Sequence, residues 1–370
     1  MKKILYTAST EIHLLSFHIP YLEWFKNQGY EVHVAYKGTN PIPFADKQWN
    51  IPFGRSPLDK TNIEAYRKLK KIIDSNNYNI IHSHTPMASF VTRLASIKAR
   101  RKGAKVLYTA HGFHFYKGGP LSNWLLFFPV EWLMSHITDG MITINKEDYD
   151  YLHSKKFGCK GKYMINGIGI DPKRLKLTDK SQKQATKESL NYNNRILVLY
   201  IAEFIDRKNH RFILEAMPEI IKSCPNIKFL FAGGGVLRDK MMNFASENNL
   251  DNYTDFLGFQ KDIGKFISVA DIGVSSSKQE GLGLGVAEMM FNGIPVIISE
   301  DRGHKELVQN EENGFMFAQN DHSAFINYVK RLYADEELRN DIGAKGQKSV
   351  DKFLIHNSLA QMIQIYKAYV

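Results

Sequence analysis

Residues 278–298 read K-Q-E-G-L-G-L-G-V-A-E-M-M-F-N-G-I-P-V-I-I, and the architecture expected of the whole chain follows from this stretch. Apolar runs at 271–276 and 294–298 predict a buried strand on either side of it. Between the strands the pattern predicts a glycine-rich loop and a short helix, which Gly293 ends at its C-cap. A strand, a loop, a helix and another strand in this order indicate a parallel α/β sheet.

Three glycines of this loop and two nearby glutamates have the spacing of a phosphate site. Gly281, Gly283 and Gly285 lie where the loop enters the helix, and N–H groups without helical partners favour an anion there. Glu280 precedes the helix and Glu288 falls inside it, which suits a nucleotide sugar with hydroxyls on both sides of its diphosphate. The spacing equally allows a solvated loop glutamate and a helix-surface glutamate, because one glycine-rich turn is a weak signal.

Alternating strand and helix patterns along the chain predict two copies of one architecture. The alternation restarts after a polar, lysine-rich linker that follows Pro172 and runs to about Asn194. The expected fold class is α/β, with two Rossmann-like doubly wound parallel-sheet domains facing a cleft. The expected domains are residues 1–175, on the acceptor side, and 176–352, which bind the donor. A C-terminal helix at about 353–370 is expected to pack back on the first domain.

The individual elements are predicted from apolar periodicity and helix-end signals. The predicted strands are 4–8, 31–36, 79–82, 105–109, 140–144, 196–202, 228–232, 254–257, 271–276 and 294–298. The predicted helices include 14–27, 62–75, 87–101, 212–222 and 236–248. In the helix at 62–75 one face is expected to hold Ile63, Tyr66, Leu69, Ile72 and Ile73.

The spacing Glu280-x7-Glu288, with E-G-L-G-L between, resembles the E-x7-E motif of retaining glycosyltransferases of family 4, which have the GT-B fold. Residues 78–171 resemble the capsular and exopolysaccharide branch of that family. The resemblance implies that Glu280 contacts the donor sugar and that Glu288 takes the ribose hydroxyls. It also implies that backbone amides at Gly283, Leu284 and Gly285 hold the diphosphate.

The same resemblance assigns further donor contacts. In the family's G-R-L…K-G pattern an Arg and a Lys bind the phosphates. Lys208 matches the Lys, whereas Glu203 stands at the Arg position, so Arg207 is the residue expected to supply the missing charge. Gly258 and Phe259 are expected to line the base pocket.

Two histidine-containing segments follow predicted strands. His111, in Y-T-A-H-G-F-H-F, resembles the family's strand-end histidine over the donor sugar, which makes His111 and Glu280 the expected catalytic residues. His82 and His84 share one face of a strand, but no third metal ligand at a fitting spacing is apparent, so structural or substrate-lining roles are expected. A D-x-D pattern is also missing. We therefore expect no cofactor and a metal-independent enzyme, with protein cations and helix amides neutralising the diphosphate.

Charge is unevenly distributed along the chain. Residues 1–176 hold 26 Lys and Arg against 13 Asp and Glu, whereas residues 177–370 hold 23 against 25. A basic half is consistent with an anionic membrane surface, a phosphate-bearing lipid or a nucleic acid, and also with lysine-rich composition alone. The two cysteines favour a reducing cytosol, and the N-terminus reads as a strand and not as a signal peptide.

The aromatic run W-L-L-F-F-P-V-E-W-L at 124–133 has two interpretations. It either packs into the core of the basic half or lies at a membrane interface beside the lysines. The second interpretation suits a cytoplasmic enzyme with peripheral contact at the inner face of the cell membrane.

Together, these patterns predict a retaining glycosyltransferase. It is expected to move a hexosyl or N-acetylhexosaminyl unit from a UDP-sugar to a lipid-linked or growing surface-polysaccharide acceptor. A nucleotide-sugar epimerase of the same architecture is an alternative that needs no acceptor. A basic nucleic-acid-binding protein is a second alternative, but aromatic and basic residues are not interleaved in a recognisable nucleic-acid motif, so no nucleic acid is expected as partner.

Overall fold

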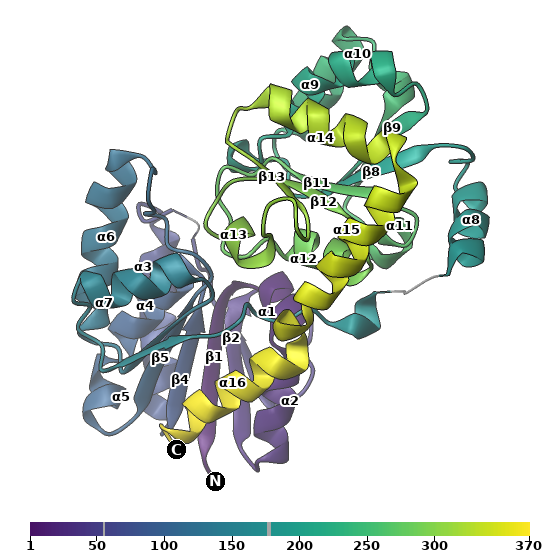
Figure 1. Ribbon diagram of the computed structural model, residues 1–370. Coiled ribbons are helices and arrows are strands. Elements are labelled where there is room, and N and C mark those ends of the chain that lie inside the picture. The colour runs from purple at the N-terminus through teal and green to yellow at the C-terminus, as the bar shows by residue number, and fades with distance from the viewer. Residues whose placement is uncertain (55, 176–178) are drawn as a thin grey trace. The chain divides into compact units, whose positions relative to one another are not determined.

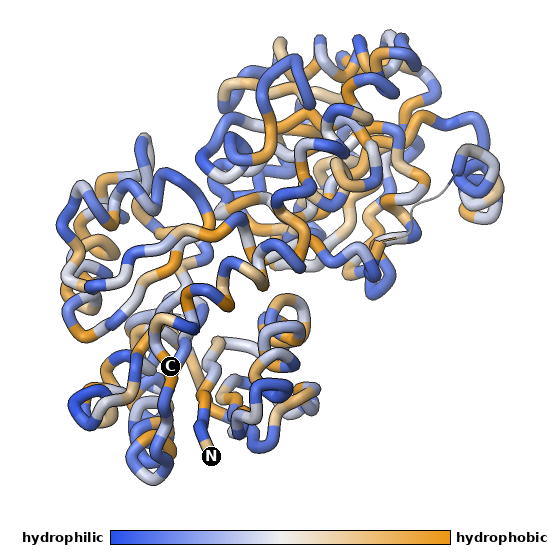
Figure 2. Tube along the Cα trace, turned by 60° about the horizontal axis from the view of Figure 1, so that its bottom comes forward, coloured by the Kyte–Doolittle hydropathy of each residue, from blue (hydrophilic) through white to orange (hydrophobic). Residues whose placement is uncertain are grey.

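The computed structural model describes residues 1–54, 56–175 and 179–370 (Figure 1). The chain forms two compact units, one of Met1–Gly169 with His356–Val370 and the other of Ile170–Ile355. The division at Gly169 comes earlier in the chain than the expected boundary at 175/176, part of which lies outside the described residues. In each unit, hydrophobic strands run through the interior and hydrophilic helical turns lie outside (Figure 2).

The first unit is built on a seven-stranded parallel sheet of order β3-β2-β1-β4-β5-β6-β7. Its strands are β1 (Lys3–Thr10), β2 (Glu31–Lys37), β3 (Lys47–Asn50), β4 (Ile80–His84), β5 (Lys105–Ala110), β6 (Gly140–Thr143) and β7 (Gly161–Met164). Its helices are α1 (Glu11–Phe17), α2 (Ile19–Asn27), α3 (Thr61–Ser75), α4 (Pro86–Ala95), α5 (Ile97–Arg101), α6 (Leu121–Ser135), α7 (Lys146–Ser154) and α16 (Ile355–Lys367).

Helices cover both faces of this sheet, as the two-residue period of the strands requires. Leu5 of β1 faces α3 and α4, which bury Leu69 and Val91 against it. The next residue, Tyr6, faces the opposite side, where its ring meets Phe25 of α2 and its hydroxyl meets that of Tyr366 in α16. The doubly wound fold is thereby confirmed for the first unit, and α16 belongs to its core.

Several predicted elements differ in detail from those observed. The helix expected at 14–27 is interrupted at His18, and the one at 87–101 is interrupted at Ser96. Strands β3 and β7 were not predicted, because both are short and half polar. The expected face of α3 is wrong at Ile63, which is 57% exposed, because the buried stripe runs through Ala65, Leu69 and Ile73 instead.

The second unit contains a six-stranded parallel sheet of order β10-β9-β8-β11-β12-β13. Its strands are β8 (Ile196–Ile201), β9 (Ile227–Ala232), β10 (Thr254–Gly258), β11 (Ile272–Ser275), β12 (Val296–Ser299) and β13 (Phe315–Phe317). Its helices are α8 (Lys180–Ser189), α9 (His210–Ser223), α10 (Arg238–Glu247), α11 (Gly264–Ile267), α12 (Leu284–Phe291), α13 (His304–Leu307), α14 (His322–Ala334) and α15 (Glu336–Ser349). Helices α9, α10 and α14 bury one face of this sheet.

The region expected to be a linker contains more structure than its composition indicates. Helix α8 forms within it and begins with a capping box, in which Asp179 and Gln182 exchange side-chain and backbone hydrogen bonds. Lys183 and Lys187 of this helix both pair with Asp271, which precedes β11. Residues 176–178 of the expected linker lie outside the described residues.

Helix α6 divides the aromatic run between the core and the surface, which confirms core packing for part of it and leaves the membrane interpretation a prediction. Trp124, Phe127 and Phe128 pack against the core cluster of β5, β6 and α7. Another side of the helix stays in solvent, where Leu121 and Leu125 are 72% and 71% exposed. Within the described part of the chain, no helix has the length and apolar character needed to cross a bilayer.

A buried ion pair fixes α6 to α4. Arg93 of α4 is fully buried, and its Nη2 donates to Glu131 Oε2 of α6 over 2.9 Å. The guanidinium also lies 4.3 Å from the centre of the Tyr108 ring. Because a buried charge without its partner is costly, α6 depends on this pair.

We expect Glu131→Gln to lower the free energy of unfolding by about 3 kcal/mol or more, because Arg93 would remain buried and charged. Chemical denaturation followed by circular dichroism measures this change. Glu64→Gln is the matched control, since Glu64 pairs with Lys68 on the exposed face of α3. Equal effects of the two substitutions would contradict the structural role of the buried pair.

Candidate donor site

The strand order of the second unit reverses between β8 and β11, so the loops after these two strands separate in opposite directions. In open parallel sheets, ligands bind outside the carboxyl ends of the strands at such a point. The loop after β8 contains the short 3-10 turn Asp206–Lys208, and the loop after β11 contains Glu280. The predicted donor residues from these two loops therefore lie around the opening between the loops, at the carboxyl ends of the central strands β8 and β11.

Lys208 and Glu280 form an ion pair at these strand ends. Lys208 Nζ donates to Glu280 Oε1, and the glutamate is only 9% exposed. Arg207 lies at the rim, with its Nη1 3.8 Å from Glu280 Oε2 and 3.1 Å from the Gln279 carbonyl. Burial raises the pKa of Glu280, but Lys208 and then His304 outweigh it, so the net pKa lies below its usual range and the carboxylate is ionised.

Backbone contacts hold the lysine in place. The Tyr200 hydroxyl donates to the Lys208 carbonyl over 2.6 Å, and Ser276 Oγ donates to the Asn209 carbonyl over 2.8 Å. Asn209 ends the turn in the left-handed region with a φ of 51°. Because each of these contacts fixes the main chain at or next to Lys208, the position of the lysine side chain in the site is constrained.

The first turn of α12 supplies the amides that the sequence predicted. Gly283 is the N-cap at a φ of +93° and offers no side-chain cap, so the first N–H groups, from Leu284 onward, have no partner within the helix. A Cβ on Gly283 would lie 3.0 Å from His304 Cδ2, and one on Gly285 would lie 3.1 Å from Ile201 Cβ. A side chain is therefore disfavoured at Gly283 by both φ and space, whereas at Gly285 it would press against Ile201.

Glu288 lies on the same helix and is 7% exposed. Burial raises its pKa to about 7, with Arg174 lowering and Asp171 raising it to smaller extents. A helix-surface position is thus excluded for Glu288, and a solvated loop position is excluded for Glu280.

Three residues of the site were missed in the sequence. Arg302 Nε donates to the Glu280 carbonyl over 3.4 Å, and His304 Nδ1 lies 2.7 Å from Asp301 Oδ2. Burial lowers the pKa of His304, but Asp301, Glu280 and the Ser299 carbonyl together outweigh it, so the net pKa is above its usual value. His304 Nε2 is buried and has no hydrogen-bond partner among the described residues. The signal was the D-R-G-H run after the strand 296–299.

The remaining predicted donor residues lie at the carboxyl end of β10, on the same side of the sheet. Gly258 ends β10 with a φ of +67°, and its carbonyl accepts from the Gly233 amide over 2.8 Å. Phe259 follows it and is 71% exposed, which is unusual for a phenylalanine. Glu203 is exposed, so its carboxylate is not buried among the residues that surround Glu280.

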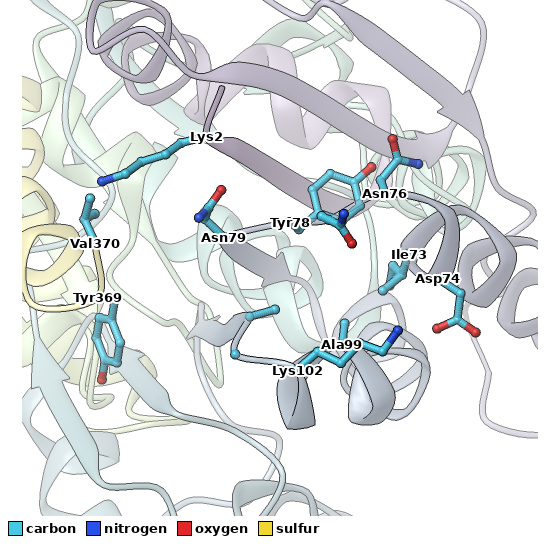
Figure 3. A pocket seen from close by; sticks show the side chains of 13 residues that line it. Lys2, Ile73, Asp74, Asn76, Tyr78, Asn79, Ala99, Lys102, Tyr369 and Val370 are labelled. Carbon is cyan, nitrogen blue, oxygen red and sulfur yellow. The ribbon is translucent and has the colours of Figure 1, made fainter.

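A cavity of about 330 Å³ in the first unit lies at the amino ends of its strands (Figure 3). It is lined by Lys2, Asn79 and Ala104, which precede β1, β4 and β5, and by Tyr369. Since ligands of parallel sheets bind at the carboxyl ends of strands, this cavity is not a candidate for the donor site.

His111 follows β5 in the first unit, and the structure places it among other histidines. Its Nε2 lies 3.3 Å from His13 Nε2 and 3.3 Å from His84 Nδ1. Burial lowers the pKa of His111 to about 4, so the imidazole is neutral. Three other histidines, His13, His18 and His111, converge on His84, a grouping that the spacing in the sequence did not indicate. His82 has a structural role, because its ring nitrogens are hydrogen-bonded to the hydroxyls of Tyr366 and Thr109.

Known proteins resemble the chain over its whole length. Residues 3–153 match the family model "Glycosyl transferase 4-like", and residues 181–349 match "Glycosyl transferases group 1". The "Putative glycosyltransferase EpsD" of Bacillus subtilis (strain 168) is 39% identical over 372 residues, covering 100% of this chain and 97% of that protein. This chain belongs to glycosyltransferase family 4.

Two further relatives agree with this family. The UDP-Gal:alpha-D-GlcNAc-diphosphoundecaprenol alpha-1,3-galactosyltransferase of Escherichia coli is 28% identical, over 75% of this chain and 71% of its own length. Anabaena HepE, solved in complex with UDP and glucose, matches with a TM-score of 0.81 at 18% identity, covering 100% of both chains. The latter likeness confirms the GT-B fold. As a family 4 glycosyltransferase, the chain transfers a sugar from a nucleotide sugar.

The raised pKa of Glu288 predicts a specific pH dependence of stability. In the folded protein the Glu288 carboxyl loses its proton at about pH 7, whereas in the unfolded chain it does so near pH 4.5. The free energy of unfolding therefore falls as the pH rises between these values. We expect Glu288→Gln to raise the free energy of unfolding at pH 8 by up to about 3 kcal/mol. Little change is expected at pH 4, and thermal melts at both pH values measure the difference.

The control for this prediction is Glu312→Gln, because Glu312 is exposed. Its melting temperature should equal that of the wild type at both pH values. A Glu288→Gln protein that is no more stable than the wild type at pH 8 would show that the carboxylate is not destabilised by burial.

Proposed function

We propose that this glycosyltransferase moves a hexosyl or N-acetylhexosaminyl unit from a UDP-sugar, with retention, to a lipid-linked or growing surface-polysaccharide acceptor. The observation that carries the donor half is the buried Glu280 paired with Lys208 beside the first turn of α12. A carboxylate, a cation and free amides at one sheet edge offer partners for a sugar hydroxyl and for both phosphates.

The UDP specificity rests on relatives and on the edge formed by β10. The E. coli relative is named for UDP-Gal, and the HepE structure was solved with UDP. In this chain, exposed Phe259 offers a ring face on which a base can stack, and Gly258 lets the backbone approach it closely. Glu288, ionised once hydroxyl donors reach it, is proposed to take the ribose.

The chemistry is proposed to be charge stabilisation without a metal at the diphosphate. Lys208 and Arg207, with the amides of Leu284 and Gly285, bear the charge that develops on the leaving diphosphate, so the anomeric bond breaks with oxocarbenium character. The ammonium of Lys208 has three donors, so it can reach a phosphate oxygen while still holding Glu280. Glu280 then accepts from a sugar hydroxyl, and His111 is proposed as a second contact to the sugar.

The acceptor half rests on the apolar surface of the first unit. A cavity of about 450 Å³ there has a largely apolar lining, which includes Met87, Phe90 and Phe127. Beside it, α6 exposes leucines in the half of the chain with the excess of Lys and Arg. An acyl or isoprenoid chain of the acceptor fits such a surface, and basic residues favour an anionic bilayer.

Glu280→Gln and Lys208→Met are each expected to lower kcat by roughly 100-fold, because each removes charge that acts on the transition state. Transfer from labelled UDP-sugars to membrane-extracted lipid acceptors measures this rate. Lys278→Met is the matched control, since Lys278 lies in the same loop but its ammonium pairs with Asp206. Loss of activity in all three variants would contradict the proposed roles.

The same preparation separates transfer from epimerisation. NMR of the UDP-sugar with enzyme alone is expected to show no change in the configuration of the sugar. Conversion of the donor without an acceptor would instead support an epimerase.

We expect the double substitution Leu121→Glu and Leu125→Glu to weaken binding to anionic phosphatidylglycerol vesicles at least tenfold. Each leucine that enters the bilayer contributes about 1.5–3 kcal/mol, so replacing both removes more than one decade of affinity. Vesicle flotation measures the bound fraction. Leu58→Glu is the control because Leu58 is 91% exposed outside α6. Unchanged flotation of the double variant would refute the membrane contact.

A further inference from the structure

We infer that four histidines of the first unit form a binding site for a divalent transition metal of the zinc class. They are His13, His18, His84 and His111, and each offers one ring nitrogen within 4.8 Å of the other three. The site is separate from the diphosphate site of the proposed function and does not depend on it.

The spacing of the nitrogens fits a single ion. A zinc ion binds imidazole nitrogen at about 2.0–2.1 Å, so two ligands of a tetrahedral site lie about 3.3–3.4 Å apart. His111 Nε2 lies 3.3 Å from both His13 Nε2 and His84 Nδ1. No pair exceeds 4.8 Å, so the widest gap has to close by at most about 1.4 Å to reach this separation.

Hydrogen bonding among the rings does not satisfy the cluster. A neutral imidazole has one donor and one acceptor nitrogen. His18 is 2% exposed, and its Nε2 atom has no hydrogen-bond partner among the described residues. Leaving a buried polar atom unpaired costs about 1–3 kcal/mol, so an ion that accepts the lone pair of this ring removes part of that cost.

The electrostatic setting also favours a metal over an anion. His18 and His84 are buried, and burial disfavours the charged imidazolium, so these rings present the lone pairs that a metal requires. The groups that act on them electrostatically are histidines, and no lysine or arginine is among them. A phosphate would meet no fixed positive charge from these rings.

The backbone brings the four rings together at the switch point of the sheet. His13 and His18 follow β1, His84 ends β4 and His111 follows β5, so all four lie at the carboxyl ends of adjacent strands. Thr85 has a φ of +64° and a ψ of 143°, a conformation that is strained for a β-branched residue. Such strain accumulates where a neighbouring side chain must point in a required direction.

The cluster can be reached from solvent through two of its histidines, one of which is His111. His13 and His111 are partly exposed, which gives an ion a path to the two buried rings. Since His111 approaches the cluster through Nε2, its Nδ1 remains for another contact. A bound metal would therefore orient the ring that the proposed function uses.

The test uses the full chain without an affinity tag, treated with EDTA and then dialysed against ZnCl2 in the absence of nucleotide. We expect one zinc per chain by elemental analysis and an absorption band of tetrahedral Co2+ after cobalt loading. His13→Asn and His84→Asn should each weaken binding at least tenfold. His153→Asn, which changes an exposed histidine of α7, should bind as the wild type does.

Less than about one zinc per five chains in the wild type would overturn the inference, as would unchanged binding by both cluster variants. Because His84 is buried, circular dichroism must show that His84→Asn is folded. The partly exposed His13 provides the second variant if it is not. Zinc binding is measured without a donor sugar, so its failure is distinct from failure of the transfer assay.

Discussion

The ion pair between Lys208 and Glu280 is the interaction on which the donor site depends. It joins the loops after β8 and β11, which the strand order sends in opposite directions, and thereby fixes the edge that faces the first turn of α12. The pair is partly buried, so its geometry is constrained more tightly than that of a surface pair. It also determines ionisation, because the cation outweighs burial and keeps Glu280 charged.

The two units use the same topology for different chemistry. In each, the strand order reverses beside the first strand, and side chains from the loops after the adjoining strands converge there. The second unit collects charged groups and helix amides at this point, which suits a diphosphate. The first unit collects neutral imidazoles, which suit a metal or the hydroxyls of a sugar. The shared fold therefore supplies the position, and the residues at the strand ends supply the function.

Local patterns predicted much of this structure. Continuous apolar runs such as 196–202 and 228–232 correspond to β8 and β9, because buried parallel strands leave no room for polar residues. The E-x7-E spacing identified Glu280 and Glu288 because one loop and one helical turn connect them. Ile63 was misassigned since apolar periodicity cannot tell which of two overlapping stripes faces the sheet. The histidine cluster was missed because its members come from three separate strand ends, a relation that sequence spacing does not contain.

Two buried polar groups that lower the stability of the second unit lie where the ligand is proposed to bind. Glu288 is buried with a pKa of about 7, and His304 Nε2 is buried without a hydrogen-bond partner among the described residues. Each feature lowers the stability of the protein alone, yet each is a polar group that a hydroxyl or phosphate oxygen can satisfy. By contrast, Asp271, away from the site, is fully paired with two lysines. A ligand that pairs with Glu288 and His304 therefore gains affinity from a cost already present in the folded chain.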